Sequence, residues 1–293
     1  MAWGKIKAWD KARTLAELVR YEHTVFALPF AYLGAFLAAG GWPPGFKLFW
    51  ITTAMIGART AAMGVNRLVD RYLDARNPRT ANRHLPRGAV RPGEVSLLVV
   101  VALGLLALSA YRLNLLCVAF LPLVVPLLII YPYTKRFTWG CHFFLGAAQF
   151  FAPFGGWIAV TARLDPAAAI LGAAVGLWVA GFDIIYATMD YDFDRREGLY
   201  SLPARFGLKP ALRVARGVHL VVFMLLLYLY PYLGLGGWYL AGVMVTGALL
   251  LYEHSLVSPG DLSRVNTAFF NVNGVISVVL FLFSVLDTVL KGG

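Results

Sequence analysis

The sequence is poor in charge, and poorest in negative charge. Of its 293 residues, 14% are Asp, Glu, Lys or Arg and only 15 are acidic, whereas a soluble domain averages about 25% charged residues. The mean hydropathy is correspondingly high, at +0.68. A chain of this composition needs a solvent other than water, so an ordinary soluble domain is excluded and an integral membrane protein is predicted.

Residues that carry other common chemistries are also scarce. The two cysteines, Cys117 and Cys141, lie in apolar surroundings without C-x-x-C spacing, so we expect two small buried side chains. The five histidines are scattered, and the sequence has no H-E-x-x-H, G-x-G-x-x-G, P-loop or G-x-S-x-G motif. Nucleotide-binding and hydrolase functions therefore have no support.

Long apolar runs take the place of these features. A helix of about 20 apolar residues crosses a bilayer, and nine windows approach that length: 24–42, 47–69, 95–112, 114–132, 142–162, 166–188, 211–231, 235–252 and 268–289. They predict an all-α membrane protein with a single domain over 1–293. Ahead of them, residues 1–20 can form a basic amphipathic helix with Trp3, Trp9 and Leu15 on its apolar side, which predicts an anchor lying on the inner leaflet.

The basic residues are distributed unevenly between the two sides of this bundle. With a cytoplasmic N-terminus, 20 Lys and Arg residues fall inside and four outside. The positive-inside rule then predicts a multi-pass protein of the cytoplasmic (inner) membrane whose C-terminus lies outside. The same bias accounts for the net charge of +11, so we expect membrane lipid and no nucleic acid as a partner.

The few acids are concentrated: seven of the 15 lie in two short windows at predicted cytoplasmic helix ends. In the first window, Asn66, Asp70 and Asp74 are spaced by four residues, which keeps them on one side of a helix. In the second, the residues that share a face are Asp183, Asp190 and Asp194, while Asp192 points elsewhere if the helix continues that far. We expect the two sets to face each other across one cavity.

Carboxylates crowded in this way repel one another unless cations intervene. Mg²⁺ takes oxygen ligands and shares its shell with phosphates, and guanidinium groups match phosphate oxygens. The neighbouring arginines are Arg71, Arg79, Arg83, Arg195 and Arg196. The pattern therefore predicts a metal-bridged diphosphate site whose mouth is cytoplasmic.

Two other interpretations remain open. The arginines alone are explained by the positive-inside rule, although the paired aspartates are not, because intramembrane charge is costly. A cation-coupled secondary transporter would use the aspartates as an ion site, but such sites lie near the midplane, whereas these carboxylates lie at cytoplasmic helix ends.

The two windows also carry a family resemblance. "NRLVDRYLDARNPRTANRHLP" and "YATMDYDFDRREGLYSLPARFG", together with "YPYTKRFT", resemble the UbiA superfamily of membrane prenyltransferases, above all the 4-hydroxybenzoate polyprenyltransferases and their menaquinone-pathway relatives. The resemblance implies nine helices around a central cavity. It also implies Mg²⁺-dependent transfer of a polyprenyl group from an allylic polyprenyl diphosphate to an aromatic acid.

The resemblance assigns roles to individual residues. Asn66, Asp70, Asp74, Asp190 and Asp194 would hold Mg²⁺, and Asp70, Asp190 and Asp183 would be catalytic. The substrate-binding residues would be Arg79, Arg83, Lys135, Arg136, Asn66 and Tyr133. At Arg67 many family members have a motif aspartate, so we expect no metal ligand there.

The aromatic acid needs a cation of its own, because burying an unpaired carboxylate is costly. Arg136 is the first candidate and Asp183 is expected to lie near the same substrate; Arg67 and Arg59 are the other cationic candidates. The acceptor is expected to be 4-hydroxybenzoate, with a hydroxynaphthoate as the alternative.

Overall fold

Helices account for the fold. The computed structural model describes residues 8–19 and 22–291, and within those ranges it has no β-strand. Trp3 and the side chain of Trp9, predicted to face the membrane, lie outside what is described. In chain order the elements are α1 (Ala8–Leu18), α2 (Glu22–Ala39), α3 (Gly45–Arg76), α4 (Pro92–Leu113), α5 (Leu115–Thr134), α6 (Cys141–Thr161), α7 (Pro166–Ala187), the 3₁₀ turn η1 (Thr188–Asp190), α8 (Tyr191–Arg196), α9 (Leu202–Phe206), α10 (Leu208–Tyr232), α11 (Gly237–Ser255), the π-helical turn η2 (Thr267–Val272) and α12 (Asn273–Lys291).

The predicted apolar windows coincide with helices. Among the described residues, seven helical segments are long and apolar enough to cross a membrane: Gly45–Arg76, Pro92–Leu113, Leu115–Thr134, Cys141–Thr161, Pro166–Arg196, Leu208–Tyr232 and Thr267–Leu290. The described apolar part of α2 is shorter, Leu28–Ala39, and α11 is not among the seven. An all-helical, multi-pass membrane protein is therefore confirmed, while the count of nine spans is not.

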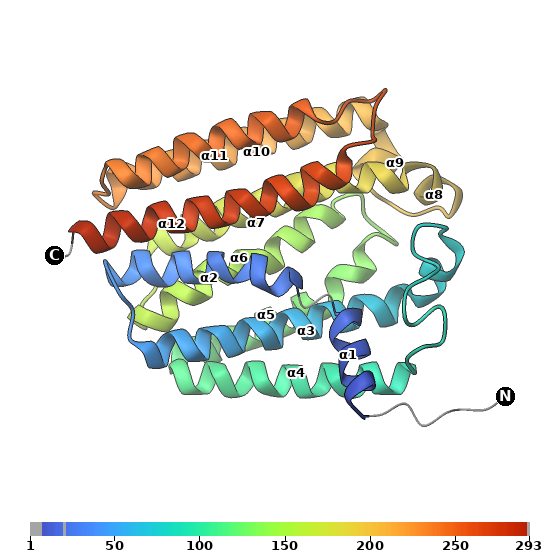
Figure 1. The fold of residues 1–293 in the computed structure, drawn as a ribbon, viewed down its shortest axis with the longest axis horizontal. Helices are drawn as coiled ribbons and strands as arrows, with labels where there is room; N and C mark the ends of the chain where they lie inside the picture. The colour runs from blue at the N-terminus through green and yellow to red at the C-terminus, as the bar shows by residue number, and fades with distance from the viewer. Residues whose placement is uncertain (1–7, 20–21, 292–293) are drawn as a thin grey trace.

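The long helices run alongside one another (Figure 1). α3 packs against α4, α6 lies between α2 and α7, and α10 packs against α7. The segments that follow α3 and α7 emerge at the same end of the bundle, and α12 ends at the opposite end (Figure 1). Both aspartate windows are thereby brought to one end.

Glycines allow several of these helices to touch backbone to backbone. A Cβ on Gly34 of α2 would lie 2.0 Å from the carbonyl oxygen of Pro153 in α6, and one on Gly146 of α6 would lie 2.3 Å from that of Gly176 in α7. A Cβ on Gly57 of α3 would lie 2.7 Å from the carbonyl oxygen of Ala102 in α4. Small residues at such crossings are typical of membrane helix packing. Helices α2, α6 and α7 thus form one tightly joined block, and α3 and α4 form another.

Helix α1 lies crosswise to α3 and α4 and packs on them (Figure 1). Leu18 is buried in a cluster with Leu85, Val90 and Val95, and Leu15 packs against that cluster. The backbone oxygen of Leu18 accepts a hydrogen bond from Arg67 Nε at 3.3 Å. The apolar side that was predicted to face the membrane is therefore used, at Leu15, for contact with the bundle.

Candidate active site

The first aspartate segment lies on an unbroken helix. α3 continues from Gly45 to Arg76, and its i, i+4, i+8 spacing brings Asn66, Asp70 and Asp74 to the lining of one pocket. Asp70 and Asp74 are 3% and 6% exposed. Buried carboxylates need partners, because desolvation of an unpaired charge is costly.

The second aspartate segment is broken where a continuous helix was considered. α7 ends at Ala187, one 3₁₀ turn follows, and α8 begins at Tyr191. Asp183, Asp190 and Asp194 nevertheless line the same pocket as the first segment. Asp192 is exposed and lies outside the pocket lining, although the continuous helix on which its expected direction depended is absent. The structure thus brings both aspartate sets to one cavity.

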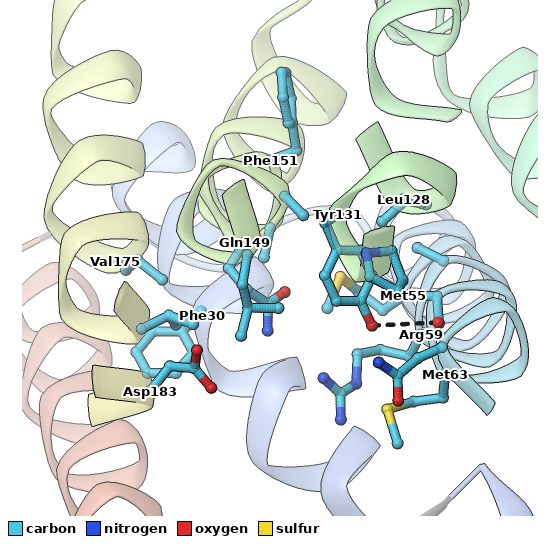
Figure 2. A pocket seen from close by; sticks show the side chains of 18 of the residues that line it. Phe30, Met55, Arg59, Met63, Leu128, Tyr131, Gln149, Phe151, Val175 and Asp183 are labelled. Carbon is cyan, nitrogen blue, oxygen red and sulfur yellow. Dashed lines mark hydrogen bonds between the residues drawn. The ribbon is translucent and has the colours of Figure 1, made fainter. Parts of the chain in front are cut away.

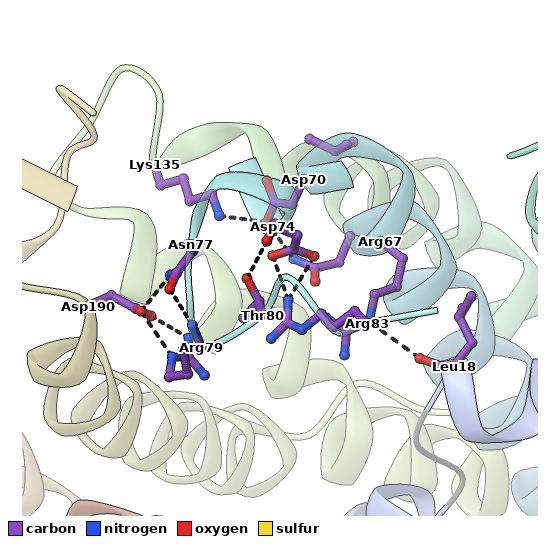
Figure 3. Close-up of polar contacts among 12 residues, drawn as sticks. Leu18, Arg67, Asp70, Asp74, Asn77, Arg79, Thr80, Arg83, Lys135 and Asp190 are labelled. Atoms are coloured by element: carbon purple, nitrogen blue, oxygen red, sulfur yellow. Dashed lines mark hydrogen bonds and ion pairs between the residues drawn. The ribbon is translucent and has the colours of Figure 1, made fainter. Parts of the chain in front are cut away.

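Basic side chains neutralise the first segment (Figure 3). Asp70 accepts hydrogen bonds from Lys135 Nζ at 2.5 Å and from Arg136 Nη2 at 3.0 Å. Arg83 Nη1 contacts both carboxylate oxygens of Asp74, at 2.7 and 2.9 Å. Each of these carboxylates therefore already has a cation in contact.

The loop after α3 reaches across to the second segment. Arg79 forms an ion pair with Asp190 and donates from Nη1 to the Tyr186 hydroxyl at 2.8 Å. Burial opposes the charge of Arg79, but its bonds to Asp190 outweigh that cost, so the pKa of the guanidinium is raised. Asn77 strengthens the link: its Nδ2 donates to Asp190 Oδ1 at 2.9 Å, and its Oδ1 accepts from the Arg79 amide at 3.0 Å. Asn77 was missed from the sequence, although its place in "DARNPRTANR", three residues after Asp74, was a usable signal.

The pocket that includes this charged mouth has a volume of about 500 Å³, and most of its wall is apolar. Figure 2 shows Arg59 and Asp183 on opposite sides of it, with the amide of Gln149 between them. The Arg59 Nε is buried and has no hydrogen-bond partner, whereas the Tyr131 hydroxyl donates to the carbonyl oxygen of Ala62 at 3.2 Å. An unpartnered buried donor facing a cavity favours an anionic guest.

Asp183 has a partner that sequence analysis missed. His142, in the first turn of α6, is 2% exposed, and its Nδ1 lies 2.7 Å from Asp183 Oδ2. The two residues are 41 positions apart, and no sequence spacing links them.

Several predicted residues are not brought to the pocket. Arg136 contacts Asp70 and the carbonyl oxygens of Pro132 and Val69, and both it and Tyr133 lie outside the pocket lining. The arginines that turn to other partners are Arg71, which donates to Tyr72, Arg195, which donates to Tyr191, and Arg196, which donates to the carbonyl oxygen of Asp192. Arg67 does line the pocket.

The donor set fits a hard divalent cation. The candidate ligands Asn66, Asp70, Asp74, Asp190 and Asp194 all offer oxygen and all line the pocket, which suits Mg²⁺. Among the described side chains, no group of three or more His, Cys, Asp or Glu lies close enough to hold an ion. Asp190, Asp74 and Asp70 instead pair with Arg79, Arg83 and Lys135.

The chain is similar to known proteins over most of its length. The model of the UbiA prenyltransferase family matches residues 27–275. The chain is 33% identical over 244 residues to 4-hydroxybenzoate octaprenyltransferase of Salmonella paratyphi C and 32% identical over 244 residues to that of Citrobacter koseri, covering 82% of this chain and 83% of each relative.

Solved structures give the same answer for the fold. The apo structure of a UbiA homologue from Aeropyrum pernix K1 superposes with a TM-score of 0.83 at 33% identity, over 91% of this chain and 98% of that one. A UbiA homologue from Archaeoglobus fulgidus, solved with DMAPP and Mg²⁺, has a TM-score of 0.71 at 18% identity over 92% and 97% of the two chains, and at that identity it shows the fold alone. Two aspartate segments line one pocket, the family model matches most of the chain, and the relatives are about one-third identical to it. This chain is therefore a member of the UbiA prenyltransferase family.

Proposed function

We propose that this protein transfers a polyprenyl group from an allylic polyprenyl diphosphate to an aromatic acid, of which 4-hydroxybenzoate is the first candidate. The observation that carries the proposal is the joining of two sites in one pocket: an aspartate mouth neutralised by Arg79, Arg83 and Lys135, and an apolar interior that contains the unpartnered Nε of Arg59. The relatives named above support the choice of acid, because they are 4-hydroxybenzoate octaprenyltransferases.

The mouth would bind the diphosphate. Arg79, Arg83 and Lys135 donate to phosphate oxygens in place of their present carboxylate partners, and the metal is held by Asn66, Asp70, Asp74, Asp190 and Asp194. Bound Mg²⁺ supplies stabilisation of the negative charge that develops on the leaving group.

The interior would hold the two groups that react. Its apolar walls exclude water and accommodate the prenyl chain, while Arg59 pairs with the carboxylate of the acid. Arg136 loses the acceptor role first expected for it, because its guanidinium contacts Asp70 at the mouth. Arg136 is instead assigned to hold Asp70 and the diphosphate end.

The reaction balances without any further reactant. A ring carbon next to the phenolic hydroxyl forms a bond to the allylic carbon, and the allylic carbon–oxygen bond breaks with its electron pair going to diphosphate. The ring proton leaves to the Asp183 carboxylate, which faces the pocket opposite Arg59 (Figure 2). Asp183 is thus a general base, an assistance worth about 10²–10⁴ in rate.

The proposal includes a single domain with nine spans around a central cavity, placed in the cytoplasmic membrane. The N-terminus and the diphosphate mouth are cytoplasmic and the C-terminus lies outside, as the distribution of basic residues favours.

The test is an assay of the purified protein in detergent or vesicles. Geranyl diphosphate is supplied with 4-hydroxybenzoate, with a hydroxynaphthoate or with a neutral phenol, each with and without Mg²⁺. We expect a prenylated acid, formed only with Mg²⁺. Product from the hydroxynaphthoate alone would move the protein to the menaquinone-type reaction, and no product from any acceptor would overturn the proposal.

A further inference from the structure

His142 makes two hydrogen bonds, and each leads to a different part of the pocket. Its Nδ1 lies 2.7 Å from Asp183 Oδ2, and its Nε2 lies 3.3 Å from the backbone nitrogen of Leu202. Leu202 begins α9, and the N-cap residue of that helix, Ser201, donates from Oγ to Asp194 Oδ2 at 3.0 Å. A single buried ring therefore contacts the acceptor-side carboxylate and the turn that holds a diphosphate-side carboxylate.

The backbone contact fixes which ring nitrogen carries the proton. The Leu202 amide can only donate, so Nε2 must accept and carries no hydrogen in this contact. The proton of the neutral ring is then on Nδ1, which donates it to Asp183. Asp183 thus receives a hydrogen bond in a fixed direction from a side chain that packing holds in place.

We propose that His142 is a positioning residue for prenyl transfer, holding the Asp183 carboxylate toward the acceptor ring while keeping its own proton. The inference rests on the proposed function, because it concerns the step in which Asp183 takes the ring proton. His142 is not among the residues that line the pocket, so it acts through Asp183 by limiting the rotation of that side chain. Misplacing a reacting group by about 1 Å can cost about 100-fold in rate.

Two substitutions separate the two hydrogen bonds. His142→Asn retains an amide near the position of Nδ1 and can still donate to Asp183. His142→Gln retains an oxygen near the position of Nε2 and can still accept from the Leu202 amide, but it lacks a donor at the Nδ1 position. The two variants have the same polar group, but His142→Asn keeps the hydrogen bond to Asp183 and His142→Gln keeps the one to the Leu202 amide.

We expect His142→Asn to keep kcat within about tenfold of wild type, while His142→Gln and His142→Ala lose about 100-fold, the scale of a misplaced group. The KM for geranyl diphosphate should change little in both amide variants, because His142 does not line the pocket. Thermal unfolding of each variant is measured alongside. The amide pair decides the question even where the Ala variant does not fold.

A second measurement reports on the proton itself. With 4-hydroxybenzoate deuterated at the ring carbons next to the hydroxyl, slow proton removal appears as an isotope effect on kcat. We expect a larger isotope effect in His142→Gln than in wild type or His142→Asn.

The reverse ranking, with Gln active and Asn inactive, would overturn the inference and assign His142 to holding α9. Equal loss in both variants without any isotope change would also overturn it. Failure of the proposed function looks different, because the wild-type protein itself then makes no prenylated acid.

Discussion

The two aspartate segments reach the same pocket on different backbones. The first lies on α3, which continues unbroken for 32 residues. The second crosses a break: α7 ends at Ala187, and Asp190 has φ −100° and ψ 10° before α8 begins. Helical spacing alone therefore places the candidate ligands on α3, whereas those of the second segment also depend on the 3₁₀ turn between α7 and α8.

The two segments also differ in the residues that neutralise their carboxylates. Asp70 contacts two basic residues of the turn that follows α5, Lys135 and Arg136. Asp190 is served by Arg79 and Asn77, which belong to the loop that follows the first segment. The loop after α3 therefore supplies the partners of Asp190 and, through Arg83, the partner of Asp74, so damage to that loop affects both segments.

Removing the metal tests both segments at once and should have the largest effect. Because both sets of carboxylates are proposed to act through Mg²⁺, EDTA should reduce product formation to background, and excess Mg²⁺ should restore it. Radiolabelled prenyl transfer before and after re-addition measures this. Full activity after chelation and dialysis would contradict a metal role for either segment.

Single substitutions test the segments separately. Asp70→Asn and Asp190→Asn should each lower kcat by about 10²–10³, the scale of one lost charge-stabilising group in a transition state. Asp192→Asn is the matched control, because Asp192 lies beside Asp190 in sequence but is exposed and outside the pocket lining.

Initial rates and thermal unfolding of the three variants are compared. A near-normal rate for Asp190→Asn with an inactive Asp70→Asn would show that only the unbroken helix carries metal ligands. If Asp192→Asn lowers the rate as much as the other two substitutions do, then the exposed face of α8 that carries Asp192 belongs to the active site.

Substitution of two arginines compares the mouth of the pocket with its interior, and we expect smaller effects than for the aspartate variants. Arg59→Gln should raise the KM for the aromatic acid, and Arg136→Gln should raise that for the prenyl diphosphate. Each loses a hydrogen bond to a charged group, about 1.5–3 kcal/mol, or roughly 10- to 100-fold. Steady-state kinetics with each substrate varied in turn separate the two. If Arg136→Gln affects only the aromatic acid, the acceptor lies nearer the mouth than proposed.

Much of the fold could be predicted because bilayer-length apolar runs leave few alternatives. The line of Asn66, Asp70 and Asp74 followed from spacing, because α3 is regular there. The break after Ala187 could not be predicted, since Thr188 and Met189 carry no Gly or Pro signal. The site of Arg136 depends on how α5 ends against α3, and the His142–Asp183 contact depends on how α6 packs on α7; neither is a property of a single segment.

The glycine crossings have a mechanical consequence for the size of the prenyl group. They join α2, α6 and α7 into one stiff unit and α3 and α4 into another, with α5 in contact with both. α5 contains Pro122, Pro126 and Pro132, each of which removes one helical hydrogen bond. We expect α5 to bend at these prolines when a longer prenyl chain enters the cavity. The longest prenyl group that the protein accepts then depends on how far α5 can bend as well as on the volume of the cavity.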